Sequence, residues 1–169
     1  MPLHKLTART LLAIITLSIA VLSWSLPNDR EQPINIQADA AEQVIHEGRE
    51  KTIYTGNVIM TQGSMLIEGD EVTILSQERS VTKIIATGKP AHFKQQSEQQ
   101  QHPTKAYAQR INYDLGDEAI VLLNDASLMQ GGDTISGKRI DYNIATEQVK
   151  AASTNDSRVN IVLEPKKNP

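Results

Sequence analysis

The 169-residue sequence contains no cysteine, which excludes disulfides, thiolate metal sites, thiol nucleophiles and lipidated cysteines. In an oxidising compartment its stability must therefore come from buried apolar side chains and backbone hydrogen bonds. Aromatic residues are also scarce, at 4% of the chain, with one Phe and one Trp. Aliphatic side chains and methionine must then line most of any interior, and such a lining adapts to partners of variable shape.

A stripe of basic residues is missing as well. Lys5 and Arg9 are the only charged residues before residue 26, so the remainder carries 15 basic and 20 acidic residues. An acidic domain without a basic stripe is poorly suited to bind a phosphate backbone. We therefore expect no nucleic acid partner.

No apolar run is long enough to span a bilayer. The longest, Leu11–Leu22, has about 12 residues, against the roughly 20 that a spanning helix needs. It follows a basic start and precedes Ser23-Trp24-Ser25, the order of a secretory signal. We expect a signal peptide at residues 1–25, one domain at 26–164 and a short polar tail at 165–169. An uncleaved anchor remains the alternative, because Ser-Trp-Ser is a poorer cleavage site than Ala-x-Ala.

Two short patterns recur along the chain with a period of about 30 to 40 residues. The first is a small residue, two mostly polar residues and an apolar or small one, at Ala38–Ala41, Gly69–Val72, Ala108–Ile111 and Gly137–Ile140. The second ends in Gln, at Val58–Gln62, Ala91–Gln95 and Ala126–Gln130. Two independent patterns with a shared period indicate a repeated structural unit.

Each unit has the pattern of a strand, a turn and a second strand. Stretches of 8 to 13 residues with period-2 alternation, such as Ile34/Ile36 and Val159/Ile161/Leu163, lie between turn signals such as Gln62-Gly63-Ser64. β-Branched residues dominate the alternating positions, and no segment after the signal shows a helical apolar stripe. The sequence predicts an all-β fold: an elongated antiparallel β-jelly roll, built from repeated hairpins and open at its ends. We interpret Gln95–Pro103, the longest polar stretch, as a solvated hairpin loop.

Residues that could carry catalysis or bind a metal are dispersed. His46, His92 and His102 follow no metal-ligand spacing, and Ser64 lacks the Gly-x-Ser-x-Gly context of a nucleophile. Gly131-Gly132-Asp133 is a turn signal with no helix after it to form a phosphate loop. We expect no enzyme, no cofactor and no metal site.

Several segments resemble one family. Tyr54–Gly63 (YTGNVIMTQG) followed by Ile67–Asp70 (IEGD) resembles the OstA-like superfamily, which contains the LptA family, the anchored LptC family and the N-terminal domain of LptD. Gln32–Asp39 resembles the mature N-terminus of LptA-type proteins, and Gly88–Gln95 and Ile111–Tyr113 continue the match. The resemblance covers about residues 32–163. The short apolar run and the end at Pro169 favour the LptA family.

The resemblance implies a periplasmic bridge in a Gram-negative bacterium. Such a protein binds lipopolysaccharide through the acyl chains of lipid A and passes it from an inner-membrane extraction complex to an outer-membrane translocon. The implied partners are an LptC-like inner-membrane protein, an LptD-like outer-membrane protein and further copies of the chain, stacked head to tail.

Alternation and resemblance together select candidate residues. The predicted lipid-binding inner face consists of Ile34, Ile36, Val58, Met60, Met65, Ile67, Val72, Ile74, Phe93, Ile111, Tyr113, Leu115, Leu128, Ile135 and Ile140. The predicted docking edges, which would pair with other chains as added strands, are Ile34, Asn35, Ile36, Gln37, Val159, Asn160, Ile161, Val162 and Leu163.

Two alternatives stay open at this point. One is a relative held in the inner membrane by its N-terminal segment, acting as an LptC-like acceptor of lipopolysaccharide. The other is a structural β-module that joins membrane complexes and binds no lipid, in which case the inner face is only a packed core.

Overall fold

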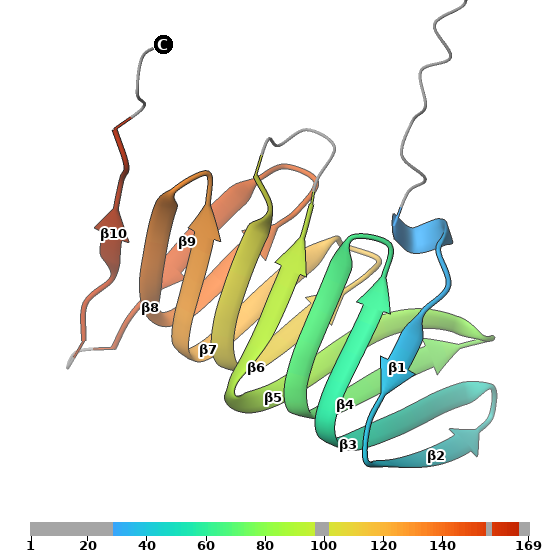
Figure 1. Cartoon of the computed structure of the whole chain (residues 1–169). Coiled ribbons are helices and arrows are strands. Elements are labelled where there is room, and N and C mark those ends of the chain that lie inside the picture. The colour runs from blue at the N-terminus through green and yellow to red at the C-terminus, as the bar shows by residue number, and fades with distance from the viewer. Residues whose placement is uncertain (1–28, 97–101, 155–156, 166–169) are drawn as a thin grey trace, which may run out of the picture.

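A computed structural model describes residues 29–96, 102–154 and 157–165, so the predicted signal peptide and most of the predicted tail lie outside the described residues. The described part contains a single turn of 3-10 helix and otherwise consists of antiparallel strands and turns (Figure 1). No helix among these residues is long and apolar enough to cross a membrane. The elements are η1 (Asp29–Glu31), β1 (Asn35–Gln37), β2 (Ala40–His46), β3 (Arg49–Gln62), β4 (Met65–Gln77), β5 (Ser80–Gln95), β6 (Thr104–Asp114), β7 (Ala119–Gln130), β8 (Asp133–Asn143), β9 (Gln148–Ala152) and β10 (Asn160–Val162).

The described strands form one sheet in the order β1-β3-β4-β5-β6-β7-β8-β10. β2 pairs with β3 beside β1, and β9 pairs with β8 beside β10, so each end of the sheet carries two short edge strands. The sheet does not close on itself. The predicted all-β jelly roll, built from repeated hairpins and open at its ends, is therefore confirmed.

Each long strand bends near its middle, which folds the sheet over on itself (Figure 1). At the bend, β3, β5 and β7 each carry more residues than their neighbours, as in the register shift between Thr55 and Val58. An extra residue on one strand bends that strand and increases its twist. Gly56, Asn57, Asn124 and Asp125 have positive φ there, a conformation that Gly, Asn and Asp tolerate best.

We call this line of bulges the corner, and the two arms of the folded sheet the β1 half-sheet and the β2 half-sheet. The β1 half-sheet contains β1, β10 and the strand segments 58–62, 65–69, 91–95, 104–108, 126–130 and 133–137. The β2 half-sheet contains β2, β9 and the segments 49–55, 71–87, 110–123 and 139–143. Hairpin turns at the far end of each half-sheet form two rims, and the space between the rims is called the mouth.

The sequence repeats coincide with this geometry. The first pattern lies at the corner, where there is little room for side chains: a Cβ on Gly69 would lie 2.7 Å from the carbonyl oxygen of Thr87. The second pattern runs from the corner to the rim of the β1 half-sheet on β3, β5 and β7. One prediction was wrong in detail. Gln95 is the last residue of β5 and not part of a solvated loop, and residues 97–101 of the predicted loop lie outside the described residues.

Candidate functional site

The interior of the β1 half-sheet contains an apolar row that crosses eight strands. Each member is the direct cross-strand partner of the next, so the row runs from one end of the sheet to the other. Five of its members are at most 2% exposed: Met60, Ile67, Phe93, Ala106 and Leu128. The complete row is Ile36, Met60, Ile67, Phe93, Ala106, Leu128, Ile135 and Ile161.

The β2 half-sheet presents two similar rows to the same interior. The row next to the corner is Tyr54, Val72, Ala86, Ile111, Leu122, Ile140 and Ala151. The row nearer the mouth is Thr52, Ile74, Ile84, Tyr113, Ile120, Tyr142 and Val149. The rings of Phe93 and Tyr113 meet edge to face across the interior, with centroids 6.0 Å apart. The rows of the two half-sheets therefore pack against each other as one continuous apolar core.

All fifteen residues predicted for the inner face lie in or against this core. Four of them, Ile34, Ile36, Leu115 and Ile135, are partly buried and pack against it. The other eleven are buried members: Val58, Met60, Met65, Ile67, Val72, Ile74, Phe93, Ile111, Tyr113, Leu128 and Ile140. Their contact with lipid stays a prediction.

Sequence reasoning missed part of the same interior. Ile84, Ile120, Leu122 and Tyr142 are each at most 2% exposed and belong to the rows of the β2 half-sheet. Leu122 stands within Ala119–Leu123, a continuous apolar run whose outward members hide the period of 2. Cross-strand pairing with Ile111 and Ile140, which only the folded sheet reveals, identifies it as inward-facing.

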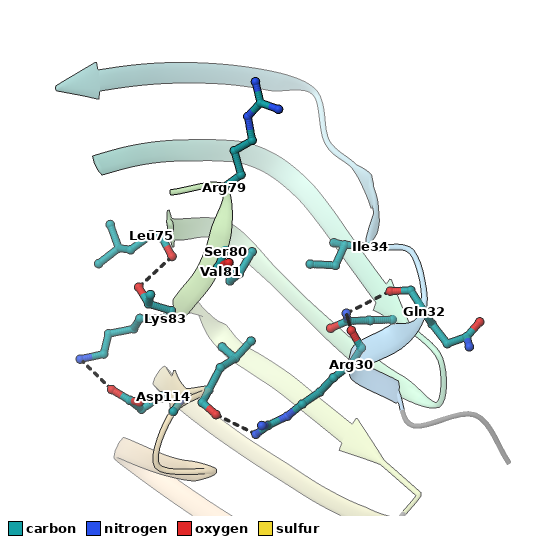
Figure 2. A pocket seen from close by; sticks show the side chains of 13 residues that line it. Arg30, Gln32, Ile34, Leu75, Arg79, Ser80, Val81, Lys83 and Asp114 are labelled. Carbon is teal, nitrogen blue, oxygen red and sulfur yellow. Dashed lines mark hydrogen bonds and ion pairs between the residues drawn. The ribbon is translucent and has the colours of Figure 1, made fainter. Parts of the chain in front are cut away.

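A cavity of about 700 Å³ opens into the mouth beside β1 (Figure 2). Its apolar lining comes from Ile34, Leu75, Val81 and Leu115, which belong to segments from both half-sheets. Polar residues surround these side chains, including Arg30, Gln62, Arg79, Lys83 and Asp114. The cavity thus combines an apolar floor with a polar rim, which suits a molecule that has both kinds of surface.

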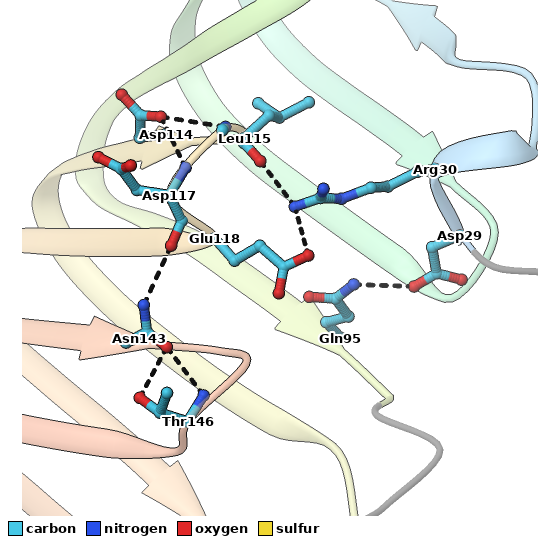
Figure 3. Close-up of polar contacts among 10 residues, drawn as sticks. Asp29, Arg30, Gln95, Asp114, Leu115, Asp117, Glu118, Asn143 and Thr146 are labelled. Atoms are coloured by element: carbon cyan, nitrogen blue, oxygen red, sulfur yellow. Dashed lines mark hydrogen bonds and ion pairs between the residues drawn. The ribbon is translucent and has the colours of Figure 1, made fainter.

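Two adjacent residues of η1 connect the rims (Figure 3). Asp29 accepts hydrogen bonds from the rim of the β1 half-sheet: Ser64 N and Oγ at 2.6 Å each, and Gln95 Nε2 at 3.0 Å. Arg30 reaches the rim of the β2 half-sheet, where its Nη2 donates to the carbonyl oxygen of Leu115 at 2.7 Å and lies 2.9 Å from Glu118 Oε1. The segment Asp29–Gln32 therefore bridges the mouth, and we call it the strap.

Electrostatic effects at the mouth are local. Burial raises the pKa of the Tyr113 phenol, while the hydrogen bond and charge of Arg30 act in the opposite direction. Tyr113 therefore stays neutral at physiological pH. The backbone N–H of Asp117, followed by contact with Lys83, lowers the pKa of Asp114 despite some desolvation. Asp114 is thus a stable anion that orders the β6–β7 turn.

The residues predicted as docking edges lie at the two ends of the sheet. Asn35, Ile36 and Gln37 form β1, while Asn160, Ile161 and Val162 form β10. Ile34 precedes β1 as a partly buried residue, Val159 precedes β10, and Leu163 follows it with 70% of its surface exposed. Sequence reasoning missed the second edge strand at each end. β2 is exposed along its whole length, including Val44 and Ile45, and β9 extends β8 at the opposite end.

Among the described residues, no group of three or more His, Asp or Glu side chains is placed to hold a metal ion. His92 instead lies 3.3 Å from Glu68 on the outer face and contacts the ring of Tyr107.

The fold and its interior define an open β-jelly roll whose apolar rows run between unpaired edge strands. The chain belongs to the LptA/(LptD N-terminal domain) LPS transport protein family, whose model matches residues 35–148. It is 36% identical over 165 residues to the lipopolysaccharide export system protein LptA of Haemophilus influenzae, covering 95% of this chain and 94% of that protein. It is 31% identical over 164 residues to LptA of Escherichia coli K12, covering 96% and 87% respectively.

A further relative has a known structure. The chain is 34% identical over 154 residues to the lipopolysaccharide export system protein LptH of Pseudomonas aeruginosa, covering 86% of this chain and 87% of that protein. The crystal structure of LptH, described as the LptA homologous periplasmic component of the lipopolysaccharide transport device, superposes with a TM-score of 0.73. That comparison covers 82% of this chain and all of the LptH chain. These relatives are named as transport proteins and not as enzymes.

Proposed function

We propose that this protein is a periplasmic bridge that carries lipopolysaccharide between the two membranes, with the acyl chains of lipid A held between its half-sheets. The observation that carries the proposal is the apolar row that crosses eight strands, from Ile36 at one end of the sheet to Ile161 at the other. Membership of the family and the names of the relatives support the cargo.

The physical basis of cargo binding is burial of hydrocarbon. Each methylene removed from water contributes roughly 0.8 kcal/mol, so several acyl chains along the rows would be bound strongly. The interior is closely packed, and Met60 and Ile67 are fully buried. Ladder hydrogen bonds run within each half-sheet, whereas contacts such as Phe93 with Tyr113 join the half-sheets through side chains alone. The half-sheets can therefore separate at the mouth without breaking the ladder.

Photo-crosslinking in cells tests whether lipopolysaccharide binds between the half-sheets, in what we call the groove. A photoreactive residue at Ile36 or Phe93 is expected to capture lipopolysaccharide, because both positions face the interior. The matched controls are Asn35 and Lys94, the exposed sequence neighbours that point to the outer face. Adducts at the inner positions alone would support the groove. Equal capture at inner and outer positions, or no adducts at any inner position, would contradict it.

The edge strands supply the docking surfaces in this proposal. We propose that β1 and β2 of one copy meet β9 and β10 of the next, and that the same ends contact LptC-like and LptD-like partners. Exposed apolar side chains accompany the unpaired edges, including Val44 and Ile161, which are more than half exposed. Such edges invite pairing by strand addition, and a head-to-tail contact that does not close forms an open filament.

Light scattering over a range of concentrations tests the docking edges. Ile161→Asp is expected to abolish growth of assemblies and to leave the thermal midpoint unchanged, because the side chain is exposed in the single copy. Met129→Asp is the control, since Met129 is an exposed apolar residue on the outer face of a central strand. Assembly that survives Ile161→Asp, or that Met129→Asp reduces equally, would exclude this end as the interface.

A further inference from the structure

We propose that the outermost inward-facing row of the β1 half-sheet is a polar recognition row, which binds the amide, ester and hydroxyl groups at the head of the acyl chains. This inference rests on the proposed function and specifies which side chains bind the polar groups of the cargo. Cross-strand pairs Gln62–Met65, Gln95–Thr104 and Gln130–Asp133 place the row along the rim. The polar recognition row is Gln62, Gln95, Thr104, Gln130 and Asp133, and Met65 is the one apolar side chain among them.

Polarity changes sharply between this row and the one behind it. The apolar row that contains Met60 and Phe93 lies two residues further from the rim on each strand. Two residues of strand span about 6.6 Å. An acylated amphiphile has the same layout, with carbonyl and hydroxyl groups at the root of each hydrocarbon chain. Its chains would lie against the apolar row when its polar linkages reach the polar recognition row.

The hydrogen bonds of Gln62 show which chemical groups can serve as partners of these side-chain amides. Gln62 is only 7% exposed, and its Nε2 donates to the carbonyl oxygens of Arg30 at 3.2 Å and Gln32 at 3.0 Å. A buried amide is costly unless it is hydrogen-bonded. The strap therefore supplies Gln62 with two carbonyl groups, which are chemically equivalent to the carbonyls of an acyl amide or ester. A bound lipid can replace the strap at this position without loss of hydrogen bonds.

Gln95 and Gln130 have hydrogen-bonding capacity that the fold does not fully use. Gln95 Nε2 donates to Asp29 of the strap, but Gln95 Oε1 is buried and has no hydrogen-bond partner among the described residues. An acyl N–H or a hydroxyl is the donor that this oxygen requires. Gln130 Nε2 is 3.4 Å from the hydroxyl oxygen of Tyr142 on the facing half-sheet, which is long for a hydrogen bond. A shorter bond to a ligand carbonyl would be stronger.

Binding measurements with two probes test the row in the full-length mature protein. One probe is lipopolysaccharide; the other is diphenylhexatriene, a hydrocarbon without polar groups. We expect Gln95→Leu and Gln130→Leu each to weaken lipopolysaccharide binding about five- to tenfold, because ligand polar groups are left unpaired. Binding of diphenylhexatriene is expected to stay equal or to strengthen. Unchanged lipopolysaccharide binding, or an equal loss for both probes, would overturn the polar recognition row.

Controls separate this inference from folding and from the proposed function. Gln77→Leu makes the same change at an exposed position outside the row and is expected to leave both affinities unchanged. Where Gln95→Leu does not fold, Gln95→Met keeps the length and flexibility of the side chain and must show the same selective loss. If the unaltered protein binds lipopolysaccharide and the variants bind equally well, only the row is refuted. If the unaltered protein does not bind lipopolysaccharide, the proposed function fails and the row with it.

Discussion

The corner lies near the middle of the long strands and the mouth lies at their ends, and the two regions are built in opposite ways. At the corner, small residues such as Gly69, Ala91 and Ala108 allow the bent strands to pack closely, and backbone pairing continues to within one to three residues of the bend. At the mouth, a cavity of about 700 Å³ and a polar row replace the close packing. Side chains of the strap, and not a backbone ladder, join the two rims.

This difference indicates that the corner stabilises the fold, whereas the mouth can change its shape. Most of the buried apolar side chains lie between the corner and the two rows that contain Phe93 and Tyr113, so burial from water stabilises the fold mainly there. Local opening starts where buried apolar contacts are few, and in this protein that is the mouth. A carrier needs this division, because the fold must persist while the binding space changes volume for its cargo.

The largest expected effect comes from weakening the row next to the corner. Leu122 is fully buried between its cross-strand neighbours Ile111 and Ile140. Leu122→Ala is expected to lower the free energy of unfolding by about 2 to 5 kcal/mol, because the lost methyl groups leave a cavity. Urea unfolding measures this loss.

A leucine at the mouth provides the comparison. Leu115 is only partly buried and lines the cavity, so its neighbours can close the space that a smaller side chain leaves. Leu115→Ala is expected to cost less than about 1 kcal/mol on the same urea scale. Equal losses for the two leucines would show that corner and mouth contribute alike to stability, and the comparison would fail.

Much of the fold could be predicted from the sequence because it depends on local signals. Alternation and turn residues located hairpins such as the one at Gln62-Gly63-Ser64, and the repeats indicated their succession. The corner could not be predicted in the same way. A bulge is defined by the register between two strands, so the asymmetry between Gly56-Asn57 and its partner Asp70 appears only when β3 and β4 are paired.

The mouth was predicted less completely, and for a different physical reason. The second repeat contains Gln62 and Gln95, but turn signals beside them predict a turn and a loop at these positions. Their inward orientation follows from their parity with Met60 and Phe93 on the same strands. The strap lies in a polar stretch with no periodicity. Its contacts join residues 85 positions apart, as from Arg30 to Leu115, and no local pattern encodes such a distance.

The smallest effect on stability, and the sharpest test of the mouth, is expected for the strap. Arg30 and Glu118 each keep more than a third of their side chain exposed, so solvent screens their ion pair. Arg30→Ala is expected to change the free energy of unfolding by less than about 1 kcal/mol. Because the variant loses the link between the rims, it is expected to take up lipopolysaccharide faster than the unaltered protein, as measured by stopped-flow fluorescence.

Arg79→Ala is the matched control for this change. Arg79 lines the same cavity and carries the same charge, but it lies on the β4–β5 turn and makes no ion pair with the opposite rim among the described residues. If removal of charge alone governs uptake, the two variants will change the rate alike, and the strap has no role in holding the rims together. If Arg30→Ala alone accelerates uptake while both variants unfold at the same urea concentration, the mouth opens independently of the corner. A loss of several kcal/mol on Arg30→Ala would contradict that independence, because it would place a large share of the stability at the mouth.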